Sequence, residues 1–136
     1  MIRVRSATVS DMPTVLRLIR EGAREGALLQ RPRKELLLIA QEGNILCAFD
    51  NGGIAGMVVL DLYSKRLAEV RSLYVLPGRR GMGVGAALVA HAIKRAKRFR
   101  VKELMTITLK ENAAWFARHG FSEDAHDFKT AMFKKL

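Results

Sequence analysis

Three glycines at alternate positions mark the segment of this chain best suited to binding phosphates. They lie in Arg80-Gly81-Met82-Gly83-Val84-Gly85, between a strand-like segment and one with helical spacing. Glycines let a backbone approach a ligand closely, and a following helix presents free N–H groups at its positive dipole end. We therefore predict that the backbone of Met82 to Ala86 holds a pyrophosphate, with Arg79 and Arg80 adding charge at the rim.

Two other phosphate-binding motifs do not fit this loop. A P-loop continues from its glycines into Gly-Lys-Ser/Thr, whereas Val84-Gly85-Ala86 follows here. A dinucleotide-binding fingerprint needs an acidic residue about 20 residues further on, at the end of a strand. Glu103 has about that separation, but it follows a basic run and begins a strand.

Apolar periodicity predicts the elements that position this loop. Asn51-Gly52-Gly53 predicts a hairpin, because these residue types tolerate positive φ. Ser10 or Asp11 is expected to cap the first helix, and Gly120 to end the last one. The predicted strands are 2–6, 45–50, 54–63, 68–75, 103–109 and 128–134, and the later helices are 34–41, 83–98 and 112–118. This order predicts a mixed α/β (α+β) fold.

Composition limits the class of protein. The 136 residues are 49% hydrophobic, which predicts a single domain, 1–136. No apolar run approaches about 20 residues, so we expect no membrane partner. Cys47 is the only cysteine, which fits a reducing cytoplasm, where we expect the protein. The net charge of +11 implies an anionic partner, and nucleic acid, an anionic membrane surface or a polyphosphate cofactor would each suit it.

Two segments resemble motifs of the GNAT superfamily of N-acetyltransferases. The first runs from Glu69 to Val75 and, through Pro77, into the loop, where Arg80, Gly83 and Gly85 fill the superfamily pattern R/Q-x-x-G-x-G/A. The second, 115–121, is similar to a later superfamily helix that ends in Gly-Phe. The resemblance implies a mixed, mostly antiparallel central sheet with helices on both faces and strands that splay at the cofactor cleft.

The resemblance also implies a reaction with acetyl-CoA. An acceptor amine would attack the thioester directly, with Glu69 as the base and the Val75 N–H stabilising the oxyanion, so Cys47 is not needed as a nucleophile. Phe116 stands where many members have a Tyr that protonates the leaving thiolate. CoA would then leave as a thiolate, or take a proton from Tyr63 or Tyr74. The implied cofactor contacts are Leu73, Tyr74, Val75, Arg79, Arg80, Gly81, Met82, Gly83, Val84, Gly85 and Ala86.

The acceptor side resembles N-acetylglutamate synthases. The similar segments are 26–36, 69–73 and 115–121, and they favour glutamate or a related amino acid as the small-molecule substrate. Glutamate has two carboxylates, so its pocket should be cationic. Arg31, Arg71 and Lys110 are the expected substrate contacts, since Arg can bind a carboxylate through two hydrogen bonds.

Three alternatives stay open. The basic run 94–102 would suit a nucleic-acid-binding module, but Phe99 is its one aromatic residue, which is too little for a stacking platform. Nucleic acid is therefore the less favoured partner, and we interpret the run as an exposed helix face, part of which would hold the 3′-phosphate of CoA. The other two are an enzyme of the same fold that acetylates a protein or peptide, and an acetyl-CoA sensor. No metal site is expected from the spacing of His91, His119 and His126, and a homodimer is left open.

Overall fold

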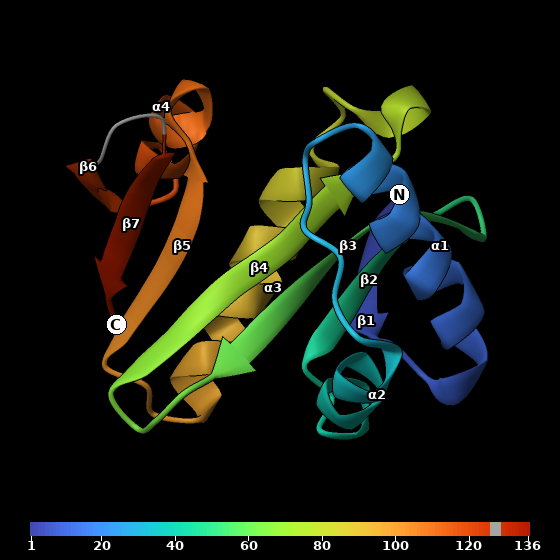
Figure 1. The fold of residues 1–136 in the computed structure, drawn as a ribbon, viewed down its shortest axis with the longest axis horizontal. Coiled ribbons are helices and arrows are strands. Elements are labelled where there is room, and N and C mark those ends of the chain that lie inside the picture. Colours follow the sequence, from blue (N-terminus) through green and yellow to red (C-terminus); the bar gives the residue numbers. More distant parts are fainter. Residues whose placement is uncertain (126–128) are drawn as a thin grey trace.

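The computed structural model describes residues 1–125 and 129–136, which contain one seven-stranded sheet (Figure 1). The strand order is β1-β2-β3-β4-β5-β7-β6, and neighbours are antiparallel except β4 and β5, which are parallel. The strands are β1 (Ile2–Ser6), β2 (Ile45–Asp50), β3 (Gly53–Leu62), β4 (Leu67–Val75), β5 (Glu103–Leu109), β6 (Ser122–Ala125) and β7 (Lys129–Lys135).

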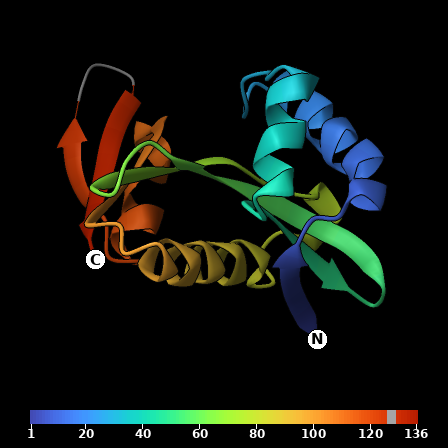
Figure 2. The ribbon, with the colours of Figure 1, turned by 90° about the horizontal axis from the view of Figure 1, so that it is seen from below.

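Helices cover both faces of this sheet (Figure 2). Helices α1 (Met12–Arg24) and α2 (Arg33–Gln41) lie on one face, while α3 (Val84–Arg98) lies on the other and α4 (Ala113–Ala117) packs near β6 and β7. Alternation along β2 supplies both cores: Leu46 and Ala48 join the α3 cluster, whereas Ile45 and Cys47 join the cluster under α1 and α2. No helix in the described part of the chain is long and apolar enough to cross a membrane.

The parallel pair at the centre of the sheet is short. Strands β4 and β5 pair only from Leu67–Glu103 to Glu69–Met105, although β4 continues to Val75. Beyond that point the two strands diverge (Figure 1). Ser72 has φ +54° at a β-bulge where β4 shifts register against β3, and a bulge bends the strand that contains it. The predicted splay is thus confirmed, and it leaves one edge of β4 uncovered by β5.

Two sequence predictions need correction. Strand β6 was not predicted, because Ser122-Glu123-Asp124-Ala125 is a short polar segment that pairs only with β7. The side chain of Asp11 does not cap α1: it forms a capping box with Thr8 across a 3₁₀ turn, Val9–Asp11, that precedes the helix. Phe128, the expected start of the last strand, and His126 lie outside the described residues.

Candidate active site

The glycine loop has the geometry of an anion cradle. Gly81 and Gly83 have φ +77° and +86°, and a Cβ added at either glycine would meet nothing within 4 Å. Gly83 occupies the N-cap position of α3, so the first N–H groups of that helix lack intrahelical acceptors and face the same space. Backbone donors beside open space at a helix N-terminus are what a pyrophosphate requires.

Gly85 has a different local role from the other two glycines. A Cβ there would lie 3.3 Å from Cζ2 of Trp115, so glycine lets α4 approach the first turn of α3. Trp115 also lies edge-on to Phe116, at 4.9 Å between ring centroids. The two segments that suggested the superfamily from sequence are therefore in direct contact. Whether Gly85 also touches the cofactor stays a prediction.

The two arginines of the loop anchor it to the rest of the fold. Arg80 donates from Nε to the Val75 carbonyl at 2.9 Å and from Nη2 to Glu25 at 3.0 Å. Arg79 donates to Asp50 at 2.9 Å. The Tyr74 hydroxyl also donates to Glu25, and these hydrogen bonds lower the pKa of that carboxyl. Each guanidinium group thus already has a carboxylate partner, and a role of Arg79 and Arg80 at the rim of the pyrophosphate site stays a prediction.

The free edge of β4 presents backbone groups toward the splay. The Leu76 N–H donates to Ala55 in β3 at 2.9 Å. Because antiparallel ladders alternate, the N–H and carbonyl of Val75 then point away from β3, toward the open side. Arg80 occupies that carbonyl, while the Val75 N–H faces the space between β4 and β5. This is the donor predicted for the oxyanion.

Glu69 lies where β4 and β5 begin to separate: its pair with Met105 is the last one between the two strands. The residue is only 8% exposed and accepts a hydrogen bond from the Tyr63 hydroxyl. Arg71 Nε is 3.9 Å from the Glu69 carboxylate and 3.9 Å from Asp61, the residue of β3 that pairs with Glu69. Burial and the hydrogen bond to Glu69 raise the pKa of Tyr63 to about 12. Tyr63 therefore keeps its proton at neutral pH and holds the Glu69 carboxylate in place.

The Arg31 side chain is buried and forms ion pairs with two carboxylates of the protein itself. Its guanidinium donates to both oxygens of Asp61, at 3.0 and 2.9 Å, and also to Glu35, and its side chain is 3% exposed. Burial opposes the charge of Arg31, but the two carboxylates outweigh it and raise the pKa of the guanidinium. Substrate contact by Arg31 stays a prediction, and it would require partners beyond those the side chain now has.

Replacement of Asp61 with asparagine is expected to destabilise the protein by about 3 kcal/mol, since a buried arginine would lose its paired charge. Urea unfolding followed by circular dichroism measures the loss. The double variant Arg31→Met/Asp61→Leu should recover much of it, because both charges are then gone. Glu21→Gln, in an exposed pair with Arg17, is the matched control and should cost less than about 1 kcal/mol. Equal losses of stability for Asp61→Asn and Glu21→Gln would contradict a buried ion pair between Arg31 and Asp61.

The remaining predicted residues differ in how well they suit their roles. Lys110 is exposed and follows β5 in a 3₁₀ turn, at the open end of the splay. Phe116 has no hydroxyl and cannot donate a proton, and its ring is 5% exposed and packs against Phe121. Burial raises the pKa of the Cys47 thiol to about 12, which leaves it inert at neutral pH. Among the described residues, no group of His, Cys, Asp or Glu could hold a metal ion.

Sequence reasoning did not single out Asp61, Glu25 or Glu35, and it named Tyr63 only as a possible proton donor to the leaving thiolate, not as the partner of Glu69. Asp61 had a usable signal, because it is the one charged residue in β3, Gly53–Leu62, an otherwise apolar strand. Nothing local identified Glu25, since its partners Tyr74 and Arg80 are 49 and 55 residues away.

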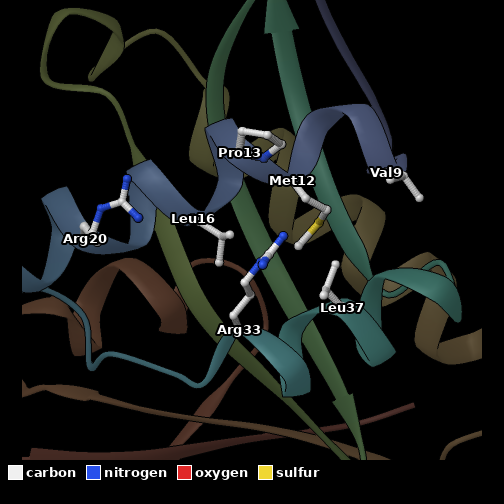
Figure 3. A pocket seen from close by; sticks show the side chains of 7 residues that line it. All are labelled: Val9, Met12, Pro13, Leu16, Arg20, Arg33 and Leu37. Carbon is white, nitrogen blue, oxygen red and sulfur yellow. The ribbon is translucent and has the colours of Figure 1, made fainter.

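A separate hollow of about 470 Å³ lies between α1 and α2 (Figure 3). Its lining combines apolar side chains with two arginines, and none of its residues belongs to the predicted site. They are Val9, Met12, Pro13, Leu16, Arg20, Arg33 and Leu37.

Comparison with known proteins identifies the class. Residues 12–121 match the acetyltransferase (GNAT) family, and the chain belongs to that family. An amino-acid acetyltransferase of Pasteurella multocida is 32% identical over 119 residues, which are 87% of this chain and 26% of that protein. The chain thus spans about a quarter of the length of this curated relative.

Solved structures show the same fold. The N-acetylglutamate synthase of Neisseria gonorrhoeae, complexed with coenzyme A and N-acetyl-glutamate, superposes with a TM-score of 0.88 at 22% identity, over all of this chain and 35% of that one. A Mycobacterium tuberculosis protein in complex with CoA gives 0.85 at 22% identity, over 98% and 99% of the two chains. The chain accordingly has the fold of the family to which it belongs, and its glycine loop forms an open backbone cradle at the N-terminus of α3.

Proposed function

We propose that this chain transfers acetyl from acetyl-CoA directly to the α-amino group of glutamate. The observation that carries the proposal is the position of Glu69: a nearly buried carboxylate, fixed by Tyr63, at the point where β4 and β5 separate. The relative from Pasteurella multocida, named an amino-acid acetyltransferase, and the Neisseria gonorrhoeae structure, which holds N-acetyl-glutamate, support the choice of acceptor.

In this proposal Glu69 removes a proton from the acceptor ammonium group. The free amine then attacks the acetyl carbonyl carbon, a C–N bond forms, the C–S bond to CoA breaks, and the nitrogen releases its second proton to solvent water as it becomes an amide. The Val75 N–H donates to the carbonyl oxygen as its charge grows. Because Phe116 cannot donate and the Tyr63 and Tyr74 hydroxyls are bound to carboxylates, the sulfur departs as a thiolate.

Two cations are available for the carboxylates of glutamate. Arg71 lies beside Glu69 with its side chain 32% exposed, and Lys110 is exposed at the far end of β5. In this assignment Arg71 binds the α-carboxylate, next to the reacting amine, and Lys110 binds the side-chain carboxylate. Arg31 acts behind them by neutralising Asp61, which faces the same region.

Lys110→Met is expected to raise the KM for glutamate about tenfold, since one charge-assisted hydrogen bond is lost. The KM for acetyl-CoA should change less than twofold. Steady-state release of the CoA thiol measures both constants. Lys65→Met, at the opposite end of the sheet, removes the same charge and should change neither. Parallel increases in both KM values for Lys110→Met would contradict substrate contact.

The proposal itself is tested by thiol release with single amino acids. Glutamate should react with the highest kcat/KM, and glutamine and alanine, which each lack one carboxylate, should be at least about tenfold poorer. Alanine as good as glutamate would contradict a two-carboxylate pocket. Turnover of a peptide N-terminus with no turnover of any amino acid would replace glutamate by a protein acceptor.

A further inference from the structure

A cationic hollow lies at the opposite end of α3 from the glycine loop. Its volume is about 640 Å³, within the range of small-molecule sites. The turn between β3 and β4 and the connection from α3 to β5 meet there, side by side in both views (Figures 1 and 2). The lining residues are Lys65, Arg66, Phe99, Arg100 and Lys102, and we call this set the distal cationic hollow.

The cations of this hollow form no ion pairs in the described part of the chain, although Glu103 follows Lys102 directly and its N–H donates to the Arg66 carbonyl at 2.9 Å. Four of its five residues are cations and none is acidic. Like charges brought together from separate segments repel one another, and a bound polyanion would relieve that repulsion. The arrangement therefore favours a ligand with several negative charges.

An exposed aromatic ring lies among these charges. Phe99, the C-cap residue of α3, has 41% of its surface accessible. The Arg95 guanidinium lies 5.3 Å from the ring centroid, and Arg95 is itself fixed by Asn44 at 2.6 Å and the Glu42 carbonyl at 2.8 Å. Arg95 thus braces the ring against the fold while leaving part of it accessible. A braced, exposed ring beside cations can stack a nucleobase.

The distal cationic hollow is not an extension of the cofactor site. Helix α3 spans Val84–Arg98, so its ends are about 22 Å apart at 1.5 Å per residue. The glycine loop precedes one end of α3 (Figure 1), whereas Phe99, Arg100 and Lys102 of the hollow follow the other end. The end of the basic run therefore lies too far from Gly83 for the expected role at the 3′-phosphate of CoA.

We propose that the distal cationic hollow binds a nucleotide through its phosphates and its base. One ring can stack one base, and four cations match the charge of a di- or triphosphate. The base would lie on Phe99, and the phosphates among Lys65, Arg66, Arg100 and Lys102. A free nucleoside polyphosphate and an exposed nucleotide of a nucleic-acid strand share this chemistry. The proposal is independent of which amine the enzyme acetylates.

Binding is measured by titrating the full chain with ATP and with a fluorescent single-stranded oligonucleotide, both in saturating CoA so that the glycine loop is filled. We expect each probe that binds to lose affinity at least tenfold in Lys65→Glu/Arg66→Glu. Phe99→Leu keeps an apolar side chain but removes the ring, and should weaken binding about fivefold or more. Arg20→Glu/Arg33→Glu, with the same charge change at the hollow in Figure 3, should change affinity less than twofold.

The outcomes separate the sources. Binding of ATP would indicate that the ligand is a free nucleotide. Binding of the oligonucleotide without binding of ATP would indicate a nucleic-acid strand. Either result supports the proposal if Phe99→Leu weakens that binding. Failure of both probes to bind would overturn it. So would equal losses in the two charge-reversal variants, or no effect of Phe99→Leu, since the affinity would then reflect net charge alone. Unchanged acetyl transfer and unfolding temperature in Phe99→Leu show that the variant is folded.

Discussion

Gly83→Glu is expected to lower the affinity for CoA by at least about 100-fold, or roughly 2.8 kcal/mol. Two effects combine at this position. The new side chain would enter the open space beside the α3 N-terminus, and its carboxylate would repel the pyrophosphate there. Isothermal titration with CoA measures the change, and acetyl transfer should fall with it.

Gly52→Glu is the matched control for backbone strain. Gly52 has φ +81°, close to the +86° of Gly83, and also has open space around it, but it lies in the β2–β3 hairpin. Both variants therefore bear a similar conformational cost, and only Gly83→Glu places a charge in the loop. Similar unfolding temperatures with CoA binding lost only in Gly83→Glu are expected. Normal CoA binding in folded Gly83→Glu would show that the loop does not hold the pyrophosphate.

Glu69→Gln is expected to lower kcat about 100-fold at neutral pH, the lower end of what a general base contributes. Glutamine can still accept the hydrogen bond from Tyr63, so the geometry is largely kept while the proton acceptor is lost. The dissociation constant for CoA should stay within about twofold. The rate of the variant should rise with pH as more of the acceptor becomes free amine, because water must then take the proton.

Glu35→Gln controls for the charge of the cluster. Glu35 pairs with Arg31, and its side chain is 46% exposed, so the substitution removes one negative charge near the site without touching Glu69. We expect kcat to fall less than threefold. If Glu35→Gln and Glu69→Gln slow the reaction equally, the cluster acts through its net charge, and Glu69 is not the base.

The elements were predictable because their signals are local. The glycines at 81 and 83, the Asn51-Gly52 hairpin and the strand Glu103–Leu109 each follow from residue types within a few positions. Strand β6 was not predictable in that way, since its polar residues form a strand only by pairing with β7.

The electrostatics of the site could not be derived from residue types. From the sequence we expected Arg31, Arg71 and Lys110 to line a pocket and to bind the carboxylates of the substrate. The structure instead pairs Arg31 with Asp61 and places Arg71 between Asp61 and Glu69. The position of Arg71 depends on the register of β3 against β4, which brings positions 61 and 69 opposite each other, whereas Arg31 reaches Asp61 from the segment that precedes α2. Residue types alone do not identify such partners: the pair 61 and 69 requires the turn between β3 and β4 to be known, and Arg31 is 30 residues from Asp61.

The most direct measurement of the central claim is mass spectrometry of the products formed from isotopically labelled acetyl-CoA and a mixture of the twenty amino acids. The proposed function predicts label in N-acetylglutamate, formed by the native chain and reduced about 100-fold in Glu69→Gln. Labelled product absent from every amino acid, while CoA still binds to the chain, would contradict it.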